Sequence, residues 1–270
     1  MLPLTRVAPL SMLRPIKRLG QNFLQDPNTI RRIVDALDAG PDDAVVEIGP
    51  GAGALTSILS EQYTRFAAIE IDDRAADLLE KELPGTRIIR EDILETDWAG
   101  LAASMQAERL HVIGNLPYYI TSQIIFSLLD AAPLIEEAVI MMQYEVAERL
   151  VAEPRTKTYG ILSVVVQLAG SVEILFPVSR NVFYPKPDVR SAMVKLRLPK
   201  SRPIVSDPHF LRTLVRTAFN QRRKTLRNSL SRLLTEEMPP LPEDMSGRRA
   251  EELSPHDFVT LADYLLGSRI

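Results

Sequence analysis

The chain has 270 residues, of which 46% are hydrophobic and 25% charged, a composition that fits a folded globular protein and excludes a disordered or collagen-like chain. It has no cysteine and only three histidines, so disulfide scaffolds, thiol nucleophiles and cysteine- or histidine-rich metal sites are excluded, and no metal is expected. No apolar run reaches the roughly 18 residues of a membrane helix, and the N-terminal residues lack the features of a secretory signal, so a cytoplasmic location is expected.

The net charge of −3 is distributed very unevenly along the chain. Residues 1–32 carry a net charge of +5 and residues 180–232 one of +12, whereas residues 33–179 carry −15 and residues 233–270 carry −5. Clustered Lys and Arg side chains suit a polyphosphate partner, because each neutralised phosphate releases counterions. The two basic blocks therefore indicate binding to nucleic acid; the alternative is a pair of solvated helix faces.

The hydrophobic pattern predicts strands that alternate with helices. In chain order, the predicted elements are a helix over 27–37, a strand over 44–48, a helix over 54–62, a strand over 66–71, a helix over 74–83, strands over 87–90, 111–114 and 138–142, a helix over 144–150, and further β-type runs over 161–168 and 193–198. This alternation predicts a doubly wound α/β sheet.

After Pro208 the apolar period becomes helical. The expected order is two apolar stripes over 210–219 and 226–234, a proline-rich linker over 238–242 and a last helix near 255–266. The expected domains are a flexible tail over 1–13, an α/β domain over 14–200 and a small helical domain over 201–270.

A glycine-rich turn follows the predicted strand 44–48. Residues 47–54 read Glu-Ile-Gly-Pro-Gly-Ala-Gly-Ala, and such a turn lets the backbone approach a ligand closely. Glu70 and Asp92 end the next two strands, where carboxylates can accept hydrogen bonds from ribose hydroxyls or an adenine amine. Open α/β sheets bind ligands at this edge, so the pattern predicts a site for NAD or S-adenosylmethionine.

Asn115-Leu116-Pro117-Tyr118 follows the fourth predicted strand and resembles the N/D-P-P-Y/F motif of amino-methyltransferases, with Leu116 in place of the first proline. An exocyclic adenine amine is a poor nucleophile, because its lone pair is delocalised into the ring. The Asn115 side-chain oxygen and the Leu116 carbonyl can accept its two N–H groups, which aims the lone pair at a methyl sulfonium. Pro117 fixes the backbone direction, and Tyr118 offers a flat face for the base. The proline-stiffened loop that begins at Phe183 could close the other side of that base.

Six segments together resemble the ribosomal RNA adenine N6-dimethyltransferase family, and most closely its small-subunit branch. In family order they are residues 20–24, 46–51, 69–72, 115–118, 183–191 and 218–226. The resemblance implies a Rossmann-like methyltransferase sheet that uses S-adenosyl-L-methionine and releases S-adenosyl-L-homocysteine, with a small C-terminal helical RNA-binding domain. It implies N6,N6-dimethylation of two adjacent adenines in the 3′-terminal hairpin loop of 16S rRNA, and a role in small-subunit biogenesis.

The resemblance also implies roles for single residues. The implied cofactor-binding residues are Gln21, Asn22, Leu24, Gly49, Gly51, Glu70, Ile71, Asp92, Ile93 and Asn115. The implied catalytic and base-holding residues are Asn115, Leu116, Pro117, Tyr118 and Phe183. The expected RNA phosphate contacts are Arg222, Arg223, Lys224 and Arg227, with Arg14, Lys17 and Arg18 as a second set. The expected partner is the small ribosomal subunit, bound by a monomer without membrane or metal.

Three alternatives stay open on the sequence. A large-subunit rRNA adenine methyltransferase that confers macrolide resistance shares the asparagine motif. A nicotinamide-dependent oxidoreductase would use the turn at 49–54, but it leaves residues 115–118 and the basic blocks unexplained. A non-enzymatic assembly or transcription factor could keep the fold, although an intact Asn115 and Tyr118 argue for retained catalysis.

Overall fold

The computed structural model describes residues 13–200 and 205–267. It consists of two compact units: the first is Met1–Ala147 with Glu173–Lys200, and the second is Glu148–Val172 with Ser201–Ile270. Of the predicted tail 1–13, only Leu13 falls within the described residues. The structure differs from the predicted division at residue 200 in one respect. Residues 148–172 belong to the unit of the C-terminal helices and not to the α/β unit.

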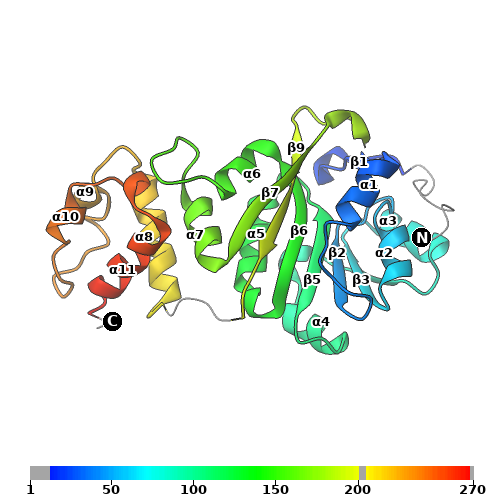
Figure 1. Cartoon of the computed structure of the whole chain (residues 1–270), viewed down its shortest axis with the longest axis horizontal. Coiled ribbons are helices and arrows are strands. Elements are labelled where there is room, and N and C mark those ends of the chain that lie inside the picture. The colour runs from blue at the N-terminus through cyan, green and yellow to red at the C-terminus, as the bar shows by residue number, and fades with distance from the viewer. Residues whose placement is uncertain (1–12, 201–204, 268–270) are drawn as a thin grey trace. The chain divides into compact units, whose positions relative to one another are not determined.

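A seven-stranded sheet forms the centre of the first unit (Figure 1). Its strands are, in chain order, β2 (Ala44–Ile48), β3 (Arg65–Glu70), β4 (Arg87–Arg90), β5 (Leu110–Asn115), β6 (Ile135–Gln143), β7 (Ser171–Val178) and β9 (Ser191–Arg197). The strand order is β4-β3-β2-β5-β6-β9-β7; β2 to β6 run parallel and β9 runs antiparallel to β6. The order reverses between β2 and β5, which is where open α/β sheets bind ligands.

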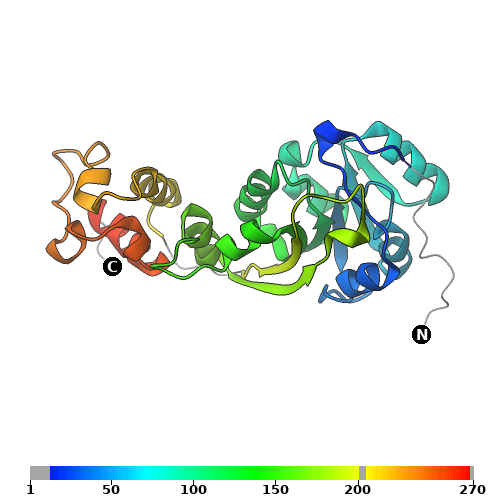
Figure 2. The ribbon, with the colours of Figure 1, turned by 90° about the horizontal axis from the view of Figure 1, so that it is seen from above.

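Helices lie on both sides of these strands (Figure 2), as the doubly wound prediction requires. They are α1 (Pro27–Val34), α2 (Thr56–Gln62), α3 (Asp73–Glu82), α4 (Trp98–Ser104), α5 (Thr121–Asp130) and α6 (Tyr144–Leu150), with short 3₁₀ turns at Lys17–Leu19, Ile93–Glu95, Ala132–Leu134 and Arg180–Val182. Every residue of β2 is buried, because helices cover both of its faces. Helices α4 and α5 and strand β7 were not predicted from the sequence.

The N-terminal segment is fastened to a distant part of the same unit. Strand β1 (Phe23–Leu24) pairs antiparallel with β8 (Phe183–Tyr184), so Leu24 lies opposite Phe183. The next element, α1, is capped by Asp26, whose carboxylate accepts the Thr29 N–H at 2.7 Å, as the predicted N-cap should. This pairing holds residues 20–24 over the carboxyl edge of the large sheet.

The second unit is helical. Its elements are α7 (Ile161–Ala169), α8 (Pro208–Asn220), α9 (Leu226–Ser229), α10 (Glu243–Ser246) and α11 (Pro255–Leu265). The prediction of a β-type run over 161–168 was wrong. Val164 is fully buried in one core cluster with Leu214 and Phe258, and the Gly160 N–H donates to Ser163 Oγ at 3.0 Å where the helix starts. The packing of α7 against the other helices of this unit outweighs the weak strand preference of its valines.

Candidate active site

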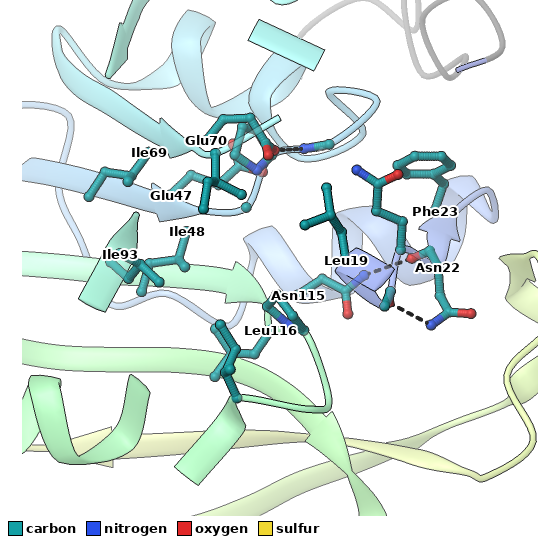
Figure 3. Close-up of a pocket in the computed structure, with 18 of the residues that line it drawn as sticks. Leu19, Asn22, Phe23, Glu47, Ile48, Ile69, Glu70, Ile93, Asn115 and Leu116 are labelled. Atoms are coloured by element: carbon teal, nitrogen blue, oxygen red, sulfur yellow. Dashed lines mark hydrogen bonds between the residues drawn. The ribbon is translucent and has the colours of Figure 1, made fainter. Parts of the chain in front are cut away.

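One cavity opens at the carboxyl ends of the parallel strands (Figure 3). Its walls are residues 19–24, 47–52, 54–55, 69–71, 91–94 and 115–120. All ten predicted cofactor-binding residues therefore line this cavity, and so do Leu116, Pro117 and Tyr118, which follow Asn115 in the chain. Leu19, Phe23, Glu47 and Tyr119 also line the cavity, although the sequence alone assigns them no role in the site.

The glycine turn after β2 has the backbone that its composition predicts. Gly49 and Gly51 have φ of +66° and +55°, a left-handed conformation that favours glycine. A Cβ atom on Gly51 would lie 3.0 Å from the Phe23 ring, so only a glycine leaves room for that ring. The turn thus keeps its backbone open towards the cavity while residue 23 packs on it.

Two acidic side chains mark the ends of β3 and β4. Glu70 accepts hydrogen bonds from the Gly51 N–H at 2.9 Å and from the Asp72 N–H at 2.8 Å, and burial raises the pKa of its carboxyl. Asp92 Oδ1 accepts the Leu94 N–H at 2.9 Å, which leaves Oδ2 for a ligand. A carboxylate oxygen has two lone pairs, so Glu70 too can accept further hydrogen bonds.

A chain of polar contacts ties the N-terminal segment to the start of α3. The Gln21 amide donates to Asp72 Oδ2 at 2.8 Å, and its oxygen accepts the Ile16 N–H at 2.8 Å. The Arg74 guanidinium also contacts Asp72, and it holds the pKa of that carboxyl below its usual range. Gln21 lines the cavity as predicted, but both polar ends of its side chain already have partners in the protein.

Asn115 lies between Leu116 and the segment that carries Leu19 and Asn22 (Figure 3). Its amide nitrogen donates to the Asn22 backbone carbonyl at 3.0 Å, which orients the amide oxygen as an acceptor. Among the described residues, no donor is bonded to that oxygen or to the Leu116 carbonyl, whereas the Pro117 carbonyl accepts from Ile120 and Thr121. Two consecutive residues of the cavity wall, Asn115 and Leu116, therefore each have a hydrogen-bond acceptor without a partner in the described part of the chain.

The Tyr118 ring is held by a hydrogen bond between its hydroxyl and Ser191 Oγ, on a strand that the chain reaches much later. Ser191 is fully buried and ends the cluster 183–191, so this cluster serves the site through its serine. Phe183 is placed differently from the expectation. It is 5% exposed, belongs to the core cluster around Leu24, and does not line the cavity. Its ring offers no face to a base in this conformation, and the stacking role stays a prediction.

Glu47 is an acidic residue inside the fully buried strand β2. It is 2% exposed, lines the cavity, and its Oε2 atom has no hydrogen-bond partner. Burial raises the pKa of its carboxyl to about 8, and the neighbouring Glu70 carboxylate adds to the rise. A carboxyl with that pKa holds its proton at neutral pH, so the cavity wall contains one neutral acid beside one that binds backbone N–H groups.

Glu47→Gln is expected to alter how stability depends on pH. In the unfolded chain the carboxyl ionises near its ordinary value of 4.5, whereas the folded protein keeps the proton to about pH 8. The folded state therefore binds more protons between these values, and wild-type stability falls as pH rises, by up to about 1.4 kcal/mol per pH unit. Urea unfolding of both proteins from pH 5 to 8 should show that the free energy of unfolding of the variant rises relative to that of the wild type as the pH increases. A difference that does not change with pH would contradict this.

The predicted RNA contacts fall into two groups. Arg14, Lys17 and Arg18 are exposed in the first unit, and Arg223, Lys224 and Arg227 are exposed in the second. Arg222 is placed differently from the expectation. Its guanidinium donates to the Glu251 carboxylate at 2.6 Å and to the carbonyls of Lys157 and Thr156 at 2.7 and 3.0 Å. Its role in the structure is to hold two loops together.

Arg222→Ala is accordingly expected to destabilise the protein, by about 1–3 kcal/mol in the free energy of unfolding, because it removes hydrogen bonds from a charged donor. Arg223→Ala, the neighbouring exposed residue, should stay within about 0.5 kcal/mol of the wild type. Urea unfolding of the two variants makes the comparison. Equal stability of the two variants would contradict the structural role of Arg222 and favour its predicted contact with RNA.

Two further findings concern metal ligands and membrane-spanning helices. Within residues 13–200 and 205–267, no three His, Asp or Glu side chains are grouped so that they could hold a metal ion. No helix of the same residues has the length and apolar character that crossing a lipid bilayer requires.

The sequence matches known proteins along most of its length. A family model described as "Ribosomal RNA adenine dimethylase" matches residues 13–266. The "Ribosomal RNA small subunit methyltransferase A" of Salinibacter ruber is 48% identical over 255 residues, covering 93% of this chain and 85% of that protein. The protein of the same name from Prosthecochloris aestuarii is 45% identical over 245 residues, covering 91% and 92%.

Solved structures show the same fold. The crystal structure of a dimethyladenosine transferase from Plasmodium falciparum superposes with a TM-score of 0.74 at 26% identity, covering 88% of this chain and 95% of that one. The 23S rRNA methyltransferase ErmE superposes with a TM-score of 0.67 at 28% identity, covering 90% and 99%. The Rossmann-like methyltransferase fold expected from the sequence is thereby confirmed.

Proposed function

Because the chain belongs to the ribosomal RNA adenine dimethylase family, and so is an rRNA adenine dimethyltransferase, we propose that it dimethylates N6 of two adjacent adenines in the 3′-terminal hairpin loop of 16S rRNA. The methyl donor is S-adenosyl-L-methionine and the product S-adenosyl-L-homocysteine. The observation that carries the proposal is the pair of free acceptors, Asn115 Oδ1 and the Leu116 carbonyl, in the wall of a cavity built for a nucleoside-type cofactor.

The residues present fit S-adenosylmethionine. At Gly49 the nearest atom to the place of a Cβ is the Asn115 carbonyl oxygen, at 3.9 Å, so a ligand can approach the backbone of the turn there. The Glu70 carboxylate stands at the end of β3, where it would accept the ribose hydroxyls, and Asp92 keeps one oxygen for the adenine amine. Residues 20–24 line the same cavity and would cover the methionine end.

The protein's part in the reaction is positioning. S-adenosylmethionine supplies, when bound, an electrophilic methyl group on a positively charged sulfur. Asn115 Oδ1 and the Leu116 carbonyl would accept the two N–H groups of the adenine amine, which favours a pyramidal nitrogen with its lone pair free. The Tyr118 ring, fixed through Ser191, would stack on the base. Holding the amine in this geometry lowers the entropic part of the barrier, and its proton can leave to water afterwards.

The target adenine has to leave any stack to reach the cavity, which costs a few kcal/mol and is easiest in a loop. Exposed basic residues of both units, Lys17, Arg18, Arg223, Lys224 and Arg227, would bind phosphates of the same RNA. The proposal includes a monomer that works in the cytoplasm on the small ribosomal subunit and contributes to its biogenesis.

The test is tritiated methyl transfer to small subunits that lack the modification, with large subunits in parallel. Incorporation of about four methyl groups per small subunit, recovered as dimethyladenosine, supports the proposal. Transfer into large-subunit RNA alone would move the protein to the resistance-methyltransferase branch. Cofactor binding without transfer to either subunit would favour a binding factor that keeps a methyltransferase fold.

A further inference from the structure

The segment between α6 and α7 is fastened to the C-terminal end of α8, and Figure 1 shows the green loop beside that end. Arg222 donates to the carbonyls of Thr156 and Lys157, and it forms an ion pair with Glu251. The Arg155 N–H donates to the Glu251 carbonyl at 2.7 Å. Three separate parts of the second unit, residues 155–157, 222–224 and Glu251, are thus held side by side.

Four cationic side chains occupy this junction. Arg155, Lys157, Arg223 and Lys224 are all exposed, and within the described residues none of these side chains has an ion pair or hydrogen bond. The nearby Glu251 carboxylate is already neutralised by Arg222. Glu153 is the one acid within residues 151–160. The junction therefore carries an excess of positive charge that the described residues do not balance.

The backbone of Arg155 provides an independent observation. Its φ is +68°, in the left-handed region where glycine is favoured and a long side chain is uncommon. A non-glycine residue in this conformation persists when the surroundings hold it, and such positions gather at functional sites. Here the hydrogen bond to Glu251 holds the backbone, and the arginine supplies a charge that glycine would lack.

We infer that Arg155, Lys157, Arg223 and Lys224 form one phosphate-binding surface that contacts the RNA backbone of the small subunit. The inference rests on the proposed function and extends its RNA contacts to the 151–160 segment, which was not among the predicted contacts. Arg222 acts on this surface as a positioning residue through its three hydrogen bonds. Phosphate contacts of this kind fix the register of the RNA and read no sequence themselves.

The Arg155→Gly variant removes the charge of this side chain without an expected loss of folding stability. Glycine suits a φ of +68°, so the variant should melt at or above the wild-type temperature while it binds small subunits more weakly. In binding measured from low to high salt, the slope of log K against log salt should fall by about 0.7–0.9 for this contact. Adding Lys157→Gln should about double that loss.

The controls distinguish the possible failures. Arg155→Lys keeps the charge and should bind as the wild type does, and Lys81→Gln removes an 80% exposed charge from the first unit and should leave the slope unchanged. An unchanged slope in the double variant, with normal wild-type binding, overturns the inference and leaves the proposed function standing. Wild-type protein that does not bind small subunits at any salt overturns both.

A crosslink identifies the partner directly. A photoreactive amino acid at position 157, in the full chain bound to small subunits, should crosslink to 16S rRNA. Crosslinking to ribosomal protein alone would overturn the assignment of this surface to RNA.

Discussion

Asn115→Ala is expected to lower kcat for methyl transfer by about 1000-fold, the upper end of the loss when one positioned hydrogen-bonding group is removed from a reacting centre. The structure gives the reason. The Asn22 carbonyl fixes the Asn115 amide at 3.0 Å, so its oxygen has one orientation, and alanine leaves the Leu116 carbonyl alone to align the amine. Single-turnover methyl transfer to unmethylated small subunits measures the effect.

A matched variant tests the geometry of this residue. Asn115→Asp keeps an acceptor oxygen but cannot donate to the Asn22 carbonyl, so we expect it to retain more activity than the alanine variant, at about one tenth to one hundredth of wild type. S-adenosylhomocysteine should still bind both variants, because Glu70, Asp92 and the glycine turn are intact. Alanine at 115 with more than a tenth of wild-type kcat would show that the amine is aligned by other groups.

Lys195→Met is expected to cost about 3–5 kcal/mol of stability, because it leaves a buried carboxylate without its cation. Lys195 is 4% exposed, and its Nζ lies 2.8 Å from Asp38 Oδ2 and 3.4 Å from Glu137 Oε2. Asp38 keeps a second partner in Arg197, at 2.7 Å. Glu137 is 2% exposed, and among the described residues it keeps only His111 and the Asp38 N–H. Urea unfolding at neutral pH measures the loss.

The companion variant is Lys195→Met with Glu137→Gln. The amide oxygen still accepts the Asp38 N–H, and no unpaired charge stays in the core, so the double variant should be more stable than Lys195→Met alone. A Lys195→Met protein within about 1 kcal/mol of wild type would mean that solvent reaches Glu137 despite its burial.

The cavity was the most predictable part of the molecule. Gly49, Glu70, Asp92 and Asn115 each lie at the carboxyl end of a predicted parallel strand, and such strands end at one edge, so chain order alone brings them together. Strand β4 has the predicted bounds, and β3, β5 and α3 differ from their predictions by a residue or two. Glu47 had a signal that was overlooked, an acid in an otherwise apolar strand.

The differences between the sequence expectations and the structure have a common cause, which is contact between parts of the chain that are far apart in sequence. The valine-rich run at 161–168 has strand preference locally, and only its burial among Leu214 and Phe258 makes it helical. Phe183, expected beside a base, pairs opposite Leu24 and lies in the core cluster of this structure, so its stacking role stays a prediction. Arg222 reads as a phosphate contact until Thr156 and Lys157, more than sixty residues earlier, are seen to accept its hydrogen bonds.

The discontinuous second unit has a consequence for synthesis of the chain. Residues 148–172 leave the ribosome before residues 201–270, yet Val164 of α7 shares its core cluster with α8 and α11 from that later part. While the chain is being synthesised, the side of α7 that packs on α8 and α11 stays exposed, even though the strands up to β6 are already present. A chain that stops at residue 200 would keep that face uncovered, so premature termination there should yield an aggregating product instead of a free-standing catalytic half.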